Sequence, residues 1–335
     1  MKIDAPLRGL PLAEVRQRAA ELEQLGVDSV WGDECQHDPF LPMPEIALGT
    51  EKLQFGTNIA IAFTRAPFSI AMTAWDLQKV SGGRFLLGLG TQVRAHIERR
   101  FSTSFDHPAA RVTDYIHCLR AIWDSFQNGT KPNYHGRFYQ FTLNNDLFNP
   151  GPIGHPDIEV YLAGVNPRMA RAAGEAADGF CVHPMHSPGY LRDIVKPAIG
   201  KGAQRRGKTV TDVSLLAETF IIRGETETER RSAELAVRQQ VAFYASTPSY
   251  RTFLDYHGHG DLGKPLSAAM RNRDFDSMLK LITDNLLAEV AVSEADGDFA
   301  SLIRGRSDDG LVQRVTLYDE VRRGAEPVRS YLERL

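Results

Sequence analysis

The segment from Gln54 to Gln92 constrains the fold more than any other part of the chain. An apolar, β-rich stretch at residues 55–63 is followed by a helix-like stretch at 70–80 and a second apolar stretch at 84–89. This order and length match one βαβ unit. Both predicted strands are apolar on both faces, which is typical of a parallel sheet covered by helices. We therefore expect an α/β fold whose functional groups follow the carboxyl ends of the strands.

Strand-like and helix-like patterns alternate along nearly the whole chain. Eight strands are predicted, at residues 2–5, 28–31, 55–62, 85–89, 159–163, 179–182, 213–222 and 312–317. Eight strands separated by helices predict a single (β/α)8 TIM barrel spanning residues 1–335. An open, doubly wound sheet is the rival fold, but no Gly-x-Gly-x-x-Gly motif follows the first strand.

Two segments exceed what a minimal barrel needs. Residues 133–152 are rich in aromatic residues, proline and glycine, and they predict a hairpin-like insertion. Residues 226–287 predict a mainly helical insertion between the seventh and eighth strands, and a further helix is expected after residue 317. Insertions of this size form lids or oligomer contacts in barrel enzymes, or serve only as scaffold. Whether the protein forms a homodimer therefore stays open.

The composition excludes several classes of partner. The chain has 335 residues with 39 basic and 42 acidic side chains, so it carries no electrostatic footprint for nucleic acid or an anionic membrane surface. No apolar run approaches the ~20 residues of a membrane helix. The three cysteines lie far apart, which implies no disulfide framework and favours a reducing cytoplasm. A small-molecule substrate is the expected partner.

Two predicted strand ends carry residues that suit chemistry. The loop after the second strand contains Glu34 and His37, a carboxylate and an imidazole that could transfer protons. A solvated polar loop explains these two residues equally well. After the fourth strand, Gly90, Thr91 and Gln92 would allow a ligand to approach the backbone closely, although tight packing of strand against helix is the simpler explanation.

Later loops add further candidates. Small residues and a proline after the fifth strand would leave backbone N–H groups free to hold a phosphate, in the turn formed by Ala163, Gly164, Val165 and Asn166. His96 could contact a ligand anion, although a charged helix start is the more common explanation. His183 and His186 follow the sixth strand, but no third ligand with local spacing supports a metal site. Histidines that line a cleft are the favoured interpretation.

Several short motifs carry a resemblance to a known family. They are Glu34-x-x-His37-Asp38-Pro39-Phe40, Thr64-Arg65-x-Pro67, Ser81-Gly82-Gly83-Arg84-Phe85, Ala177-Asp178-Gly179 and Phe243-Tyr244-x-Ser246-Thr247-Pro248-x-Tyr250. Together they resemble the bacterial-luciferase-like superfamily of flavin- and deazaflavin-dependent oxidoreductases. The last motif is similar to the narrower branch of coenzyme F-420-dependent enzymes. The likeness extends over nearly the whole chain.

The resemblance implies where a cofactor would lie. An isoalloxazine-type ring is expected across the mouth of the barrel, above a non-prolyl cis peptide bond that falls by position at Asn58–Ile59. An ordinary bulge is the alternative for that strand. The ring and its phosphate tail would contact the turns at 90–92 and 163–166, with His183 nearby. Trp31 and His96 are the expected substrate contacts.

The function that follows from the resemblance is hydride transfer to or from a small organic substrate, with coenzyme F-420 as cofactor and no metal. Glu34 with His37 is the predicted proton-transfer pair, although Glu34 stands where deazaflavin relatives have a histidine. An FMN-dependent monooxygenase of the same superfamily and a non-catalytic flavin-binding protein are the alternatives. The substrate and the direction of transfer stay open.

Overall fold

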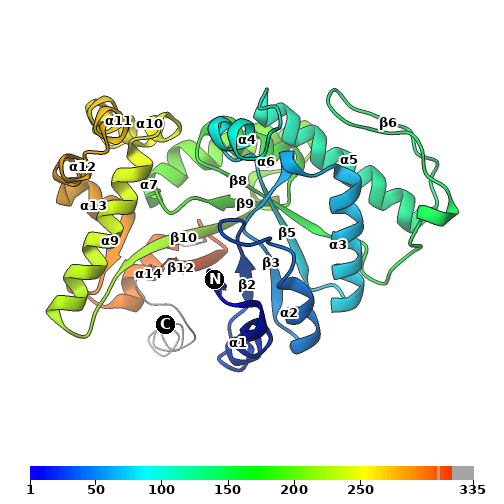
Figure 1. The fold of residues 1–335 in the computed structure, drawn as a ribbon, viewed down its shortest axis with the longest axis horizontal. Coiled ribbons are helices and arrows are strands. Elements are labelled where there is room, and N and C mark those ends of the chain that lie inside the picture. The colour runs from blue at the N-terminus through cyan, green and yellow to red at the C-terminus, as the bar shows by residue number, and fades with distance from the viewer. Residues whose placement is uncertain (308–309, 319–335) are drawn as a thin grey trace.

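The computed structural model describes residues 1–307 and 310–318. Eight parallel strands form a ring, namely β1 (Lys2–Pro6), β2 (Ser29–Gly32), β3 (Gln54–Thr57), β5 (Phe85–Gly90), β8 (Glu159–Gly164), β9 (Gly179–Val182), β10 (Ser214–Ile222) and β12 (Arg314–Tyr318). The ring closes because β10 pairs with β9 on one side and with β12 on the other, while β12 pairs with β1. The predicted TIM barrel is therefore confirmed (Figure 1).

Four short strands lie outside this ring. β4 (Ala60–Ile61) resumes the path of β3 and pairs with β5. β11 (Ala291–Ser293) adds to β10 in parallel, and the sequence pattern did not predict it because three residues are too few to show alternation. β6 (Tyr134–His135) and β7 (Gln140–Phe141) form a small antiparallel hairpin within residues 133–152.

Helices cover the outside of the barrel. Around the first six strands these are α1 (Leu12–Gln24), α2 (Met43–Gly49), α3 (Pro67–Ser81), α4 (Arg94–Arg99), α5 (Pro108–Asn128), α6 (Pro167–Ala176), and the run of α7 (Pro188–Tyr190), a π-helical turn (Leu191–Val195) and α8 (Lys196–Ala203). The longest, α5, begins with a proline, which needs no N–H partner there, and ends at Gly129 with φ +64°. Its face toward the barrel is buried.

The long segment after β10 is helical and stands to one side of the barrel. It contains α9 (Glu227–Ala245), α10 (Arg251–Tyr256), α11 (Gly263–Asn272), α12 (Phe275–Leu281) and α13 (Asp284–Val290), and α14 (Phe299–Ser307) follows β11. In Figure 1 these helices gather on the left, opposite the β6 hairpin. The helix expected after residue 317 falls outside the described residues. Within the described part of the chain, no helix is both long and apolar enough to cross a membrane.

The barrel interior is sealed below its mouth. At the amino ends of the strands, Arg314 donates to Asp4 at 2.8 Å and to Ser29 at 2.7 Å. Above this buried ion pair lies an apolar plug formed by Trp31, Leu86, Tyr161, Cys181 and Leu216. The plug separates this ion pair from the polar side chains at the mouth.

Candidate active site at the mouth of the barrel

A polar network forms the floor of the mouth. Arg8 Nη2 lies 3.0 Å from both carboxylate oxygens of Glu218, and Arg8 Nε lies 3.3 Å from Asp33 Oδ2. Asn58 donates its side-chain amide to Glu218 at 2.9 Å. The Arg8 guanidinium also stacks over the ring of Tyr318, 4.1 Å from its centre. Side chains from five strands or the loops directly after them (β1, β2, β3, β10 and β12) thus form one connected arrangement of hydrogen bonds, charge and ring stacking.

The sequence did not reveal this network. Arg8, Asp33 and Glu218 are all polar and stand where period-two alternation points their side chains inward. Arg8 and Asp33 follow the ends of β1 and β2, whereas Glu218 lies in the middle of β10. This alternation was the one feature of the sequence from which the network could have been predicted. Each residue is unremarkable alone, and the partners Arg8 and Glu218 stand 210 positions apart in the chain. Only the closed barrel brings them together.

The Asn58–Ile59 peptide bond is cis, as the resemblance led us to expect. Its position explains why a polar residue interrupts an apolar strand, because the Asn58 side chain reaches down to Glu218. Ile59 faces the neighbouring strand end, where a Cβ on Gly90 would come within 2.6 Å of Ile59 Cδ1. The side chain of Ile59 thus fills the space that any side chain at position 90 would need.

The loop after β5 turns at Gln92, which has the unusual φ of +55° for a residue other than glycine. Its side-chain oxygen accepts from the Val93 N–H at 3.1 Å and lies 3.1 Å from Nδ1 of His96. Burial and the nearby Arg100 lower the pKa of His96. The structure thus brings His96 beside the turn that also contains the half-buried Thr91.

The turn after β8 departs from expectation in one respect. Asn166 caps α6, and its side-chain oxygen accepts from the N–H groups of Arg168 and Met169, both at 3.1 Å. The cap satisfies these two donors, so they are not free to hold a phosphate, and phosphate binding by the other N–H groups of the turn stays a prediction. Ala163, Gly164 and Val165 are half-buried beside the cap, and their contact with a cofactor stays a prediction.

The predicted proton-transfer pair is not assembled. The Glu34 carboxylate accepts from Arg65 Nη1 at 2.7 and 2.9 Å and from the Ile61 N–H at 2.7 Å. Arg65 also bonds Asp38 at 2.8 Å, whereas His37 lies exposed on the same loop. These bonds commit the oxygens of Glu34 to holding β4 in place, which argues against a role in proton transfer.

Trp31 also differs from its predicted role. Its side chain is only 2% exposed and lies inside the barrel, where the indole N–H donates to Asp4 at 2.9 Å. Its ring meets that of Tyr161 edge to face, with centres 5.6 Å apart. The indole is thus part of the apolar plug, and it offers no surface to a substrate at the mouth.

His183 lies at the carboxyl end of β9, next to the helical insertion. Its ring packs edge-on against Tyr244 and Tyr250, with centres 4.2 and 4.9 Å apart. The Met185 N–H donates to His183 Nδ1 at 3.1 Å. Burial, with His186 and Arg8 nearby, lowers the pKa of His183 to about 3.

In the described part of the chain, no group of three or more histidine, cysteine, aspartate or glutamate side chains is placed to hold a metal ion.

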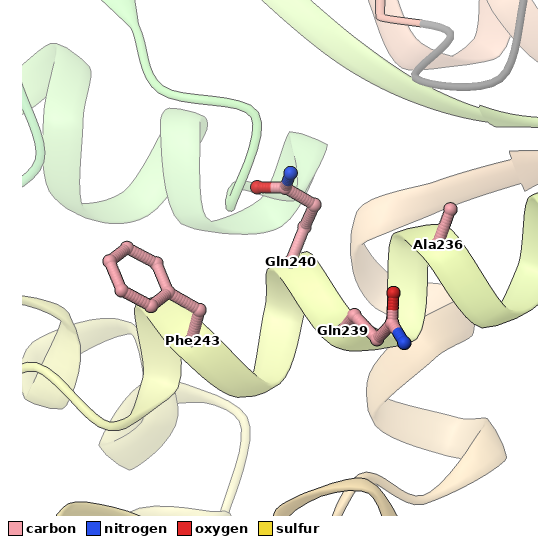
Figure 2. A pocket seen from close by; sticks show the side chains of 4 residues that line it. All are labelled: Ala236, Gln239, Gln240 and Phe243. Atoms are coloured by element: carbon pink, nitrogen blue, oxygen red, sulfur yellow. The ribbon is translucent and has the colours of Figure 1, made fainter. Parts of the chain in front are cut away.

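An open groove elsewhere is not part of this site. It has a volume of about 400 Å³ and is lined by Ala236, Gln239, Gln240 and Phe243, all on α9 (Figure 2). None of the strand-end side chains described above lines it. The candidate site is therefore the floor of the mouth with its surrounding loops, and the groove belongs to the surface of the insertion.

The closed barrel, with its polar floor at the carboxyl ends of the strands, agrees with the fold that the resemblance implied. Residues 3–311 match the luciferase-like monooxygenase family, so the chain belongs to that family. An uncharacterised protein of Mycobacterium tuberculosis is 40% identical over 94% of this chain and 92% of its own length. The 5,10-methylenetetrahydromethanopterin reductase of Methanolobus tindarius is 24% identical over 91% of this chain and 90% of its own.

The fold itself recurs in solved structures. The coenzyme F-420-dependent tetrahydromethanopterin reductase from Methanopyrus kandleri superposes with a TM-score of 0.75, covering 99% of this chain and 96% of the reductase. The two sequences are only 19% identical, so this likeness shows a shared fold. Family membership indicates an oxidoreductase or monooxygenase, and relatives use F-420 or FMN.

Proposed function

We propose that this protein is an F-420-dependent oxidoreductase that transfers a hydride to or from a small organic substrate. The observation that carries the proposal is the apolar side chain of Ile59, which lies against Gly90 next to the polar floor that holds Asn58. Two of the proteins that match most of this chain are reductases, and one of these is named for its dependence on F-420, which favours the deazaflavin.

The residues of the mouth fit a planar ring. Ile59 offers a half-buried apolar surface, and the absence of a side chain at Gly90 keeps the floor beside it low. Asn58 is fixed from below by Glu218, which Arg8 neutralises in turn. When bound, the deazaflavin would supply the carbon that gives or takes the hydride. The chain's own residues would support the ring, orient the substrate and exclude water.

A titration tests the choice of cofactor. Purified protein is titrated with oxidised F-420 and, separately, with FMN, while coenzyme fluorescence reports binding. We expect saturable F-420 binding that is at least about tenfold tighter than FMN binding, a difference of about 1.4 kcal/mol. Tight binding of FMN alone would remove the deazaflavin assignment. Binding of F-420 without turnover of any organic substrate would instead favour a non-catalytic binding protein.

The second candidate is an FMN-dependent monooxygenase, which the family match favours. Such an enzyme would consume oxygen when supplied with reduced FMN and substrate. Oxygen-electrode measurements distinguish the two candidates, since hydride transfer with F-420 proceeds equally under anaerobic conditions. We also propose a cytoplasmic location, supported by three free cysteines, of which Cys35 is exposed.

A further inference from the structure

The ring of His183 is directed into the mouth by the alternation of β9. Cys181, two residues earlier, belongs to the apolar plug inside the barrel, and a Cβ on Gly179 would meet the ring of Tyr161 in the same plug. By the same alternation, His183 lies on the inward-facing side, two residues beyond Cys181 and nearer the mouth. Arg8 of the polar floor is among the charged groups that lower the pKa of His183. Tyr244 and Tyr250 pack against it from the insertion.

The hydrogen bonds of the loop fix which ring nitrogen carries the proton. The Met185 N–H donates to Nδ1 of His183, so Nδ1 must present its lone pair and the neutral ring carries its hydrogen on Nε2. The His183 carbonyl oxygen is held in turn by Nδ1 of the buried His186 at 3.0 Å. The loop thus fixes both the tautomer and the direction of the imidazole.

The surroundings keep this imidazole neutral. The groups that face it are the rings of Tyr244 and Tyr250 and, at longer range, His186 and Arg8. None of these supplies a negative charge, and burial together with His186 and Arg8 holds the pKa of His183 far below the physiological range. A neutral imidazole donates a hydrogen bond readily, but it is too weak an acid to give up its Nε2 proton.

We propose that His183 is a catalytic residue that donates a hydrogen bond from Nε2–H to the oxygen of the organic substrate. The inference rests on the proposed function and deepens it, because it limits the substrate to a carbonyl compound or the corresponding alcohol. In the reducing direction, a hydride reaches the carbonyl carbon and the C=O π pair moves onto oxygen. Water then protonates that oxygen, while His183 stays neutral and stabilises the developing charge.

This role replaces the one that sequence spacing assigned to Glu34. The Glu34 oxygens are committed to Arg65 and to the Ile61 N–H. His183 offers a fixed donor, and no described hydrogen bond joins its Nε2 to another protein group. A fixed donor in a largely water-free site is worth more than one in bulk solvent, since it needs no reorganisation when charge develops.

The protonation state can be measured without any ligand. Long-range ¹H–¹⁵N correlation spectra of histidine-labelled protein are recorded between about pH 5 and pH 8, with the His183 signals assigned by their loss in His183→Gln. We expect a neutral ring with hydrogen on Nε2 throughout. A ring that takes up a proton in this range, or that carries its hydrogen on Nδ1, would overturn the proposal whichever cofactor binds.

Two substitutions separate hydrogen-bond donation from acid–base chemistry. The amide nitrogen of His183→Gln reaches the position of Nε2, whereas the amide of His183→Asn reaches only that of Nδ1 and can keep the bond to Met185. A panel of ketones and enones is assayed with reduced F-420, and the corresponding secondary alcohols with oxidised F-420. In both directions we expect His183→Asn to lower kcat/KM by about 100-fold or more. His183→Gln should retain much of the activity, and any change in F-420 affinity should be the same in both variants.

The other outcomes are equally decisive. Equal losses in the Gln and Asn variants would contradict donation by a neutral group. If wild type binds F-420 but turns over no member of the panel, the proposed substrate class is wrong. If wild type does not bind F-420, the proposed function fails, and the nitrogen spectra still show whether His183 has the inferred tautomer and charge.

Discussion

The guanidinium of Arg65 holds the carboxylate of Glu34, with Arg65 Nη1 2.7 Å from Glu34 Oε2. The same carboxylate accepts the N–H of Ile61, the residue two positions beyond the cis bond. Glu34 therefore connects the loop after β2 to the strand path that resumes as β4. The most prominent acidic residue of the predicted site thus supports the shape of the mouth from its rim.

Replacing Glu34 should cost stability. We expect Glu34→Ala to lower the free energy of unfolding by about 2 kcal/mol, less than for a fully buried pair because Arg65 and Asp38 are partly exposed. Glu34→Gln keeps an acceptor for Ile61 and should lose less. Urea denaturation gives the values. Glu98→Gln is the matched control, since its pair with Arg94 is exposed and should contribute under about 0.5 kcal/mol. Equal effects at both sites would contradict this role.

Adding a methyl group at Gly90 should weaken cofactor binding without unfolding the protein. The new Cβ would lie 2.6 Å from Ile59 Cδ1, so the Ile59 side chain must move. We expect F-420 to bind at least about tenfold more weakly to Gly90→Ala, a loss of about 1.4 kcal/mol. Binding like wild type would mean that the ring does not lie against Ile59.

Two other glycines calibrate that result. A Cβ on Gly88 would come within 1.7 Å of the backbone oxygen of Thr57, which cannot move as a side-chain tip can. Gly88→Ala should therefore lower the free energy of unfolding by more than about 3 kcal/mol. Gly154 has no atom within 4 Å of the added Cβ, so Gly154→Ala should leave F-420 affinity unchanged. Thermal denaturation measures the stability of the three variants, and coenzyme titration measures their affinity for F-420.

A negative charge at position 58 should be unfavourable in a pH-dependent way. Asn58→Asp would replace an amide donor 2.9 Å from Glu218 with a second carboxylate. Repulsion raises the pKa of the new carboxyl above its unfolded value, so its penalty is full near neutral pH and shrinks as pH falls. We expect a loss of about 2 kcal/mol at pH near 7 relative to Asn58→Ser. A loss independent of pH would show that charge is not the cause.

Acid should weaken the fold through its buried histidines. His186 is 1% exposed, and burial, assisted by Arg306, lowers its pKa to about 3. As pH falls below the ordinary histidine value, the unfolded chain binds a proton that the folded chain refuses, so stability falls by about 1.4 kcal/mol per pH unit for this residue. His186→Asn should remove that part of the slope. Urea midpoints at several pH values test it, and an unchanged slope would contradict the buried neutral state.

The sequence predicts the barrel well because apolar periodicity records burial directly. The eight ring strands and the cis bond at Asn58–Ile59 follow from local pattern or family resemblance. The polar floor does not, since Arg8 meets Glu218 only when the barrel closes. Spacing also cannot tell that an ionisable residue is already bonded, which is why Glu34 was assigned to chemistry.

Trp31 and Asn166 are two further residues whose roles the sequence pattern could not decide. Trp31 ends a strand and has a large aromatic surface, yet the register of β2 turns it into the plug below the mouth. Asn166 precedes a proline-started helix, which is typical of an anion site and equally of a self-capped helix. In both cases the deciding fact is the direction of one side chain, which sequence patterns do not specify at strand ends.

The proposed function depends on the position of the cofactor, and a crystal structure of the protein soaked with F-420 measures that position directly. We predict that the deazaflavin ring lies across the mouth against Ile59 and Gly90, with His183 at the edge of the substrate space. Density for the ring elsewhere, for example in the groove along α9, would contradict the account even if F-420 binds tightly.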